Sequence, residues 1–252
     1  MFSNAIALYE PINRLKPLAD GIGIVDGPLV YMSYPGLSFL KIPFPTRMTV
    51  VQLTSGETWL HSPIAFDVGL ATSLTDKAPI RHLVSPNKIH YAHIQEWKDA
   101  FPDATAWASP GVRERAQAQG VDVEFDADLG ATPPDAWRAD IDQTIIPGSF
   151  LDEVVFFHRA SRTLILADGI ENFELPKIKQ PYRFFVWAAG AYDPHGQMPI
   201  DLRSTFWSKK AEVGAAARQM IAWNPQRIVM SHGRLIDQDA VAALRYAFRW
   251  AL

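Results

Sequence analysis

Two histidines three residues apart follow an apolar run in the stretch "LVSPNKIHYAHIQEW", residues 83–97. Imidazole nitrogens bind zinc, iron and manganese, and the loop after a strand is a common place for such ligands. If His90 and His93 lie on one helix, their spacing turns them to nearly the same side, where they could share one ion. The competing interpretation is that His93 packs on the apolar side of that helix with Trp97.

Two more candidate ligands stand where predicted strands end. "RTLILAD" ends at Asp168, and "RIVMSHG" runs into His232. Asp168 could instead form a turn with Gly169, because Asp-Gly is a common turn pair. His232, followed by a glycine, could equally be a plain loop residue.

The composition limits the classes of function. The 252 residues are 48% hydrophobic, which is enough for one sizeable core, and we expect a single domain over residues 1–252. The net charge is −3 with no basic block, so neither nucleic acid nor an anionic membrane is expected as a partner. There is no cysteine, which leaves His, Asp and Glu as metal ligands. The N-terminal residues lack the pattern of a signal peptide, and no apolar run is long enough to span a membrane, so we expect a cytoplasmic protein.

Hydrophobic periodicity predicts an ordered series of elements. Residues 21–34 and 48–63 each predict a β-hairpin, and residues 142–168 predict three strands joined by turns. Between them, strands at 80–85 and 104–109 alternate with helices at 65–76, 89–101 and 110–120. The chain then ends in a helix (205–224), a strand (227–233) and a helix (238–252). This order predicts an α/β protein in which two sheets stack face to face with helices outside, a four-layer αββα sandwich.

That order, together with "SRTLILAD" and "RIVMSHG", resembles the metallo-β-lactamase-fold hydrolases. In that family, one strand ends at a metal-bridging Asp and a late strand ends at a His. The stretches "TVVQLTSGETWLHSPI", "LVSPNKIHYAHIQEW" and "FFHRASRTLILAD" resemble more narrowly a bacterial branch defined by a domain of unknown function. The resemblance covers residues 46–252, and it implies that residues 1–45 are an N-terminal extension packed on that core.

The family's first motif, His-x-His-x-Asp-His, is degenerate in this chain. Laid onto residues 86–91, it puts Pro86 and Lys88 at the first two histidines, His90 at the aspartate and Tyr91 at the last histidine. In the family's Pro-Gly-His motif, Ser149 replaces the histidine. The resemblance therefore implies one metal ion instead of two, zinc or else iron or manganese, with ligands drawn from His90, His93, Asp168 and His232.

Other residues of these motifs have candidate roles around that ion. Lys88 could bind an anionic substrate or a developing oxyanion during catalysis, or it could be an ordinary exposed lysine. Asp168 is expected to be a catalytic residue as well as a metal ligand. Asn87 could orient the histidine-bearing loop or only form an Asx-turn. His61, at the end of a strand, and Ser149 could line the same pocket without touching the metal.

Two functions follow from the resemblance. The first is a metal-dependent hydrolase that uses metal-bound hydroxide on an unknown small-molecule substrate. The second is a degenerate member of the fold, without metal or catalysis, that binds a small molecule or a protein. A serine hydrolase is not predicted, because no G-x-S-x-G occurs, and neither a Walker phosphate-binding loop nor a dinucleotide fingerprint is present.

Overall fold

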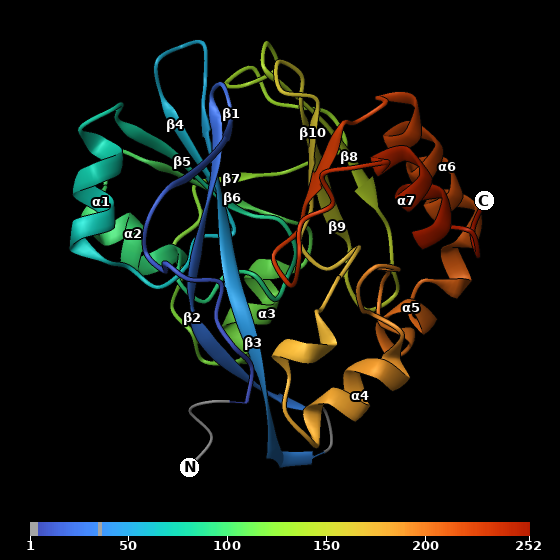
Figure 1. The fold of residues 1–252 in the computed structure, drawn as a ribbon. Coiled ribbons are helices and arrows are strands. Elements are labelled where there is room, and N and C mark those ends of the chain that lie inside the picture. Colours follow the sequence, from blue (N-terminus) through green and yellow to red (C-terminus); the bar gives the residue numbers. More distant parts are fainter. Residues whose placement is uncertain (1–4, 35–36) are drawn as a thin grey trace.

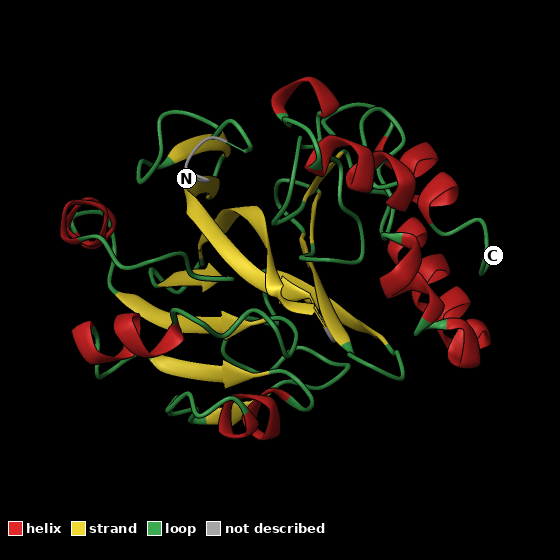
Figure 2. Cartoon of the chain, turned by 90° about the horizontal axis from the view of Figure 1, so that it is seen from below, coloured by secondary structure: helices red, strands yellow, loops and turns green. Residues whose placement is uncertain are grey.

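Two β-sheets occupy the middle of the protein (Figure 1). The computed structural model describes residues 5–34 and 37–252, without the side chains of residues 32–41. Figure 2 shows the strands between helices that lie on the two outer sides. The predicted αββα sandwich is therefore confirmed.

The larger sheet follows chain order: β1 (Lys16–Ala19), β2 (Ile22–Tyr34), β3 (Leu37–Gln52), β4 (Thr58–His61), β5 (Ile80–Ser85), β6 (Thr105–Ala108) and β7 (Ala127–Asp128). β1 to β4 pair antiparallel, whereas β4 to β7 run parallel. Parallel strands need crossover connections. These are the helices α1 (Val68–Thr75), α2 (Ile94–Ala100) and α3 (Val112–Ala118). Consequently β4, β5 and β6 end at the same edge of the sheet.

The smaller sheet has the order β11-β10-β9-β8. Its strands are β8 (Ile141–Ile146), β9 (Glu153–His158), β10 (Thr163–Ile165) and β11 (Arg227–Val229). β8, β9 and β10 pair antiparallel, and β11 joins β10 in parallel. Between β10 and β11 the chain forms α4 (Tyr182–Ala189), α5 (Ile200–Ser204), α6 (Lys210–Ala222) and the 3-10 turns η1 (Leu175–Lys177) and η2 (Trp207–Lys209); α7 (Ala240–Ala247) ends it.

The sheets divide the hydrophobic core into separate layers, and the side chains of β9 contribute to two of them. Successive side chains of a strand point to opposite faces. Val154 and Phe156 therefore face the other sheet, whereas Val155 and Phe157 pack in the cluster under α6 and α7. Both faces of β9 are covered, which explains its continuous apolar run. The helices α1 to α3 pack on the outer face of the larger sheet.

Two predicted elements differ from the observed ones. Residues 21–34 are not a hairpin: β2 is one long strand along β3, and its register shifts between Asp26 and Leu29. β3 pairs with β2 on both sides of the Asp26-Gly27 pair, so the chain does not turn there. The pair instead lies at a register shift within the strand. The helix predicted at 89–101 begins only at Ile94. The backbone N–H of Ile89 donates to the side-chain oxygen of Asn87, which stabilises a turn in place of the first helical turn.

The N-terminal segment contributes directly to the larger sheet. Residues 16–34 form β1 and β2, and Ile22 is buried between the two sheets. Residues 1–4 and 35–36 of the predicted extension lie outside the described residues. Within the described part of the chain, every helix is too short or too polar to cross a lipid bilayer.

A core substitution between the sheets tests this layering. Phe156 is fully buried, with its ring 5.0 Å from that of Trp59. We expect Phe156→Ala to lower the free energy of unfolding by about 3–5 kcal/mol in urea titrations, because it leaves a cavity between two sheets. The control is Phe184→Ala, whose side chain is 55% exposed and whose loss should cost less than about 0.5 kcal/mol. Equal costs for the two variants would contradict the proposed core.

Candidate metal centre

Three loops meet at one edge of the sandwich and bring together a cluster of His90, Asp168 and His232. Each follows a strand: His90 lies after β5, Asp168 after β10 and His232 after β11. One ligand atom from each residue lies within 4.8 Å of the others. Residues far apart in sequence thus form one group, because neighbouring strands end at the same edge.

The carboxylate of Asp168 lies between the two imidazoles. Its Oδ2 is 3.1 Å from Nε2 of His90, and its Oδ1 is 3.3 Å from Nε2 of His232. The Asp168 side chain is only 4% exposed. Each ring therefore turns its Nε2 toward one buried carboxylate.

A backbone carbonyl fixes the tautomer of His232. Its Nδ1 lies 2.7 Å from the carbonyl oxygen of Pro45. A carbonyl can only accept, so Nδ1 carries a proton, and in the neutral ring Nε2 has a lone pair. That lone pair faces a carboxylate oxygen, which is unfavourable unless a proton or a metal ion lies between them. The arrangement is the usual one for a metal-binding histidine.

Arg47 of β3 holds the loop that carries His232. Its Nη1 donates to the carbonyl oxygens of Met230 (3.0 Å) and Gly233 (2.7 Å). Its Nε and Nη2 bind Asp26 Oδ1 at 2.8 and 2.7 Å. Arg47 and Asp26 are both buried, so removal of either would leave an uncompensated charge. This buried pair therefore fixes the position of the late loop relative to β3.

The second histidine is held by a hydroxyl. Nδ1 of His90 lies 2.7 Å from Oγ of Ser62, which directly follows β4. Ser62 has a φ of 52°, a left-handed conformation that is uncommon outside glycine. Its backbone N–H donates to the carbonyl of Val84 at 2.9 Å. Because a hydroxyl both donates and accepts, it allows His90 either tautomer, including the one with a free Nε2.

A second buried carboxylate orients the first. Glu153 accepts backbone N–H groups from Ala167, Asp168 and Gly169 at 2.8–3.1 Å. The Nδ2 of Asn87 donates to both carboxylates, at 3.0 Å to Glu153 and 2.7 Å to Asp168. Asn87 thus links the loop of His90 to that of Asp168.

The ionisation of the cluster follows from burial and charge. Burial alone would raise the pKa of the Asp168 carboxyl, but His90 and His232 outweigh it and hold that pKa below its usual range. Burial alone would lower the pKa of His90, but Asp168 and then Glu153 raise it. Burial, and next the Asp168 charge, raise the pKa of Glu153. The same two causes raise the pKa of the buried Glu171 well above its ordinary value. Acidic groups therefore accumulate here, an environment that favours a cation.

The donor set fits a single transition-metal ion. Two imidazole nitrogens and a carboxylate are three protein ligands, the number found in catalytic sites that keep an open position. The same set suits zinc or iron, and the carbonyl on the outer nitrogen of His232 is a usual partner of metal-bound histidines. Among residues 5–34 and 37–252, this is the group of His, Asp and Glu that brings three ligand atoms within 4.8 Å of one another.

The other predicted site residues lie outside this group. Nδ1 of His93 lies 3.2 Å from Glu96 of its own helix. Lys88 places its Nζ 4.2 Å from the ring centre of Phe150, and burial lowers its pKa. Oγ of Ser149 donates to the carbonyl of Thr205 at 2.5 Å.

His61 lies close to the cluster without belonging to it. It stacks on Trp59 at 5.8 Å, and its Nε2 is buried without a hydrogen-bond partner among the described residues. Burial, and next the charge of His90, lower its pKa to about 3. His61 is thus a neutral ring beside the cluster.

Sequence reasoning missed three residues that hold the cluster in place. Glu153 left a signal, since a carboxylate inside the apolar strand "EVVFFH" must find partners. Arg47 and Ser62 left none, because their partners lie on other strands and the left-handed φ of Ser62 is set by tertiary packing.

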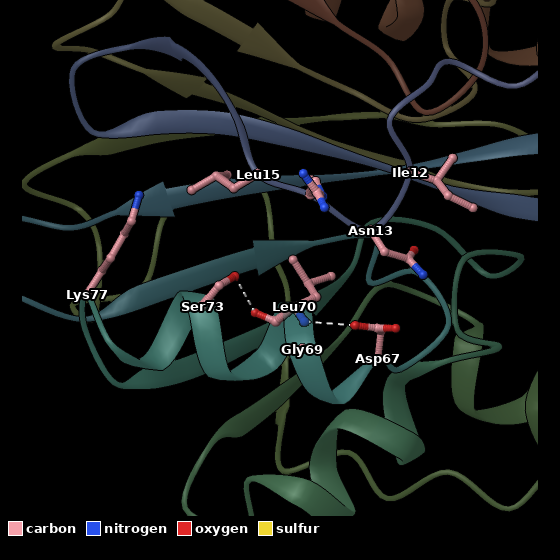
Figure 3. Close-up of a pocket in the computed structure, with 9 residues that line it drawn as sticks. Ile12, Asn13, Leu15, Asp67, Gly69, Leu70, Ser73 and Lys77 are labelled. Atoms are coloured by element: carbon pink, nitrogen blue, oxygen red, sulfur yellow. Dashed lines mark hydrogen bonds between the residues drawn. The ribbon is translucent and has the colours of Figure 1, made fainter.

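A groove lies apart from this cluster, between residues 12–15 and α1, with a volume of about 630 Å³. Figure 3 shows Asp67 and Ser73, which hydrogen bond to the backbone of α1, and Lys77 at one end. No residue of the cluster lines it.

The fold and the cluster agree with the comparison with solved structures. TMB-1, whose structure concerns substrate and inhibitor binding, is 15% identical, with 94% of this chain and 97% of that chain covered and a TM-score of 0.60. A metallo-β-lactamase from Pontibacter korlensis is 11% identical, with coverage of 94% and 98% and a TM-score of 0.58. The Flv1 flavodiiron core from Synechocystis sp. PCC6803 is 12% identical, with 98% and 61% covered and a TM-score of 0.59. At these identities the similarity shows the fold alone, which is the metallo-β-lactamase fold.

The family is narrower than the fold. The model of the domain of unknown function DUF4336 matches residues 35–182, more than half of the chain, and the protein belongs to this family. No curated protein matches the sequence significantly.

The Ser62 hydroxyl can be removed without disturbing the backbone. Glycine adopts a φ of 52° freely, so Ser62→Gly should fold at least as well as the wild type. We expect it to bind zinc about 10–100-fold more weakly in chelator competition, because a partner of a ligating imidazole is lost. Asn224→Gly, at an exposed residue with the same φ, is the matched control and should leave affinity unchanged. An unaltered affinity in Ser62→Gly would show that the hydroxyl does not support His90.

The metal-free protein should lose stability as pH rises. Because the folded-state pKa of His90 is raised, its contribution is complete below about 6.5 and is lost as pH rises through the folded value. The raised pKa of Glu153 acts in the same direction. The lowered pKa of Asp168 opposes this only in acid, where its contribution is lost below about 3.9. Urea unfolding with chelator should show a falling midpoint above about pH 6.5. His90→Gln should flatten the curve, and an equally steep curve in that variant would refute the assignment.

Proposed function

We propose that the protein is a metal-dependent hydrolase with one metal ion held by His90, Asp168 and His232. The observation that carries the proposal is the convergence of two Nε2 atoms on one buried carboxylate, with Nδ1 of His232 bound to a carbonyl. In the neutral ring this leaves a lone pair on Nε2 of His232 facing the carboxylate, a contact that a bound metal ion would satisfy. The proposal omits His93, whose ring pairs with Glu96.

The residues at the remaining motif positions favour one ion over two. Pro86 and Lys88 occupy positions where the two-metal members of the fold have histidines, and Ser149 occupies a third. Proline offers no side-chain ligand, and the Ser149 hydroxyl is committed to Thr205. A lysine ammonium on the same loop would also repel a second cation.

Three residues would bind the ion, and others would hold them in position. His90, Asp168 and His232 bind the ion, and Asn87 and Glu153 keep the carboxylate aligned between the rings. Arg47 and Ser62 orient the two imidazoles. When bound, a divalent ion supplies a Lewis acid and lowers the pKa of a coordinated water toward about 7, which is the chemistry that hydrolysis requires. Zinc suits this ligand set, and iron or manganese are the alternatives.

Elemental analysis of protein purified without a histidine tag tests the proposal. We expect about one equivalent of zinc, iron or manganese in the wild type and traces in His90→Ala and His232→Ala, because two ligands cannot hold the ion. His93→Ala is the matched control, only three residues from His90, and should keep the metal. Activity then follows from a panel of esters, lactones, thioesters and phosphodiesters, with the same variants as blanks.

Traces of metal in the wild type would overturn the hydrolase and favour the second candidate, a metal-free protein of this fold that binds a small molecule or a protein. The motif positions held by Pro86 and Lys88 are what support that alternative. Metal retained in His90→Ala would refute the ligand set alone.

A further inference from the structure

The helix α4 turns its aromatic residues to the solvent. Phe184, Phe185 and Trp187 are 55%, 52% and 54% exposed. The rings of Phe184 and Phe185 lie 5.9 Å apart, and those of Phe184 and Trp187 are equally close. Three adjoining exposed aromatic rings on one short helix are unusual for a protein surface that has no partner.

Fewer large side chains of α4 face the protein than face the solvent. Tyr182 is buried and Val186 half-buried, and both pack in a cluster with Phe173 and Phe44. Residues four apart lie on one face of a helix, so these two form the packing face, and the three exposed aromatics lie outside it. In Figure 1, α4 lies at the lower right of the molecule, near the ends of β2 and β3. The aromatics are therefore not needed to hold α4 in place.

The same region of the chain continues to expose large apolar residues. Ile200 of α5 is 49% exposed, and Trp207 of η2 is 59% exposed. Gln197 ties this segment to the end of α4, since its Nε2 donates to the carbonyl of Gly190 and its Oε1 accepts from Arg203. Of the ten exposed large hydrophobic residues in the described chain, five lie within residues 174–210.

The charge of this segment is opposite to that of the rest of the protein. Residues 174–210 contain six Lys and Arg against three Asp and Glu, a net charge of +3. Since the whole chain carries −3, the other residues carry −6. Lys179 and Arg183, beside the aromatics, are exposed and form no ion pair within the described residues. The low overall charge therefore conceals a basic, aromatic surface.

We propose that this surface, formed by Lys179, Arg183, Phe184, Phe185 and Trp187 and called here the α4 surface, binds an anionic lipid bilayer. Aromatic side chains seat in the interface between headgroups and acyl chains, and neighbouring cations bind anionic headgroups. A second copy of the chain fits less well, because a two-fold contact through α4 would bring two positive segments together. The proposal does not rest on the hydrolase.

The α4 surface is connected to the candidate metal centre through two phenylalanine rings. Phe173 and Phe44, which pack in the cluster under α4, also contact the ring of His232, with ring centres 6.4 and 5.3 Å away. Binding through α4 would therefore hold this edge of the molecule near the lipid.

Vesicle sedimentation of the full-length protein tests the proposal. We expect binding to vesicles of phosphatidylcholine with phosphatidylglycerol, weak binding to phosphatidylcholine alone, and a decrease with added salt. The triple variant Phe184→Ser, Phe185→Ser, Trp187→Ser should bind at least about tenfold more weakly. Lys179→Gln with Arg183→Gln should remove the preference for the anionic lipid. The matched control is Val68→Ser with Val121→Ser, two exposed apolar residues on the other side of the fold, and it should bind as the wild type does.

Because the chain has no cysteine, a single introduced cysteine can carry a dye that reports whether its position contacts the lipid. A single Ala188→Cys carrying an environment-sensitive dye should shift to the blue on anionic vesicles, whereas the same dye at Thr72→Cys on α1 should not. Absence of wild-type binding at low salt, or equal binding by the triple variant, would overturn the proposal. So would a dimer in light scattering that the triple variant abolishes, because the α4 surface would then serve a second copy of the chain.

Discussion

The buried carboxylate of Asp168 is the charge on which the candidate site depends. A carboxylate that is 4% exposed cannot be left without compensation, and two imidazoles with the Asn87 amide supply it. Each of these partners comes from a different loop than Asp168. The need to neutralise one buried charge thus joins the ends of β5, β10 and β11, which belong to both sheets of the sandwich.

Around this charge, a second set of buried polar groups fixes the loops. Glu153 accepts hydrogen bonds from backbone N–H groups of residues 167–169. Arg47 donates hydrogen bonds to backbone carbonyls of residues 230–233. Both use charge-assisted hydrogen bonds to backbone groups, which are strong and directional in a buried environment. The loops can therefore be irregular in structure and still hold the Nε2 atoms in place. This is the supporting shell that a metal-binding histidine requires.

The edge of the sandwich and the α4 surface are linked by packing. The ring of His232 contacts Phe44 and Phe173, and these pack in the cluster beneath α4. The chain between β10 and β11 thus does two things: it returns to the smaller sheet, and it places Phe173 against the ring of His232. Because the basic residues of this segment are balanced elsewhere, the net charge of the whole chain gives no sign of it.

Local sequence determined much of the framework. Alternating and continuous apolar runs predicted the sheets and the order of helices, because burial on one or two faces of an element imposes a period on the sequence. Strand ends at Asp168 and His232 also predicted two members of the cluster. Tertiary structure alone decided the rest: whether His90 or His93 enters the group, that 21–34 is one strand, and that Arg47, Ser62 and Glu153 hold the site. These depend on pairing between strands and on buried charges meeting across loops. Such contacts join residues up to 187 positions apart, and no local pattern encodes them.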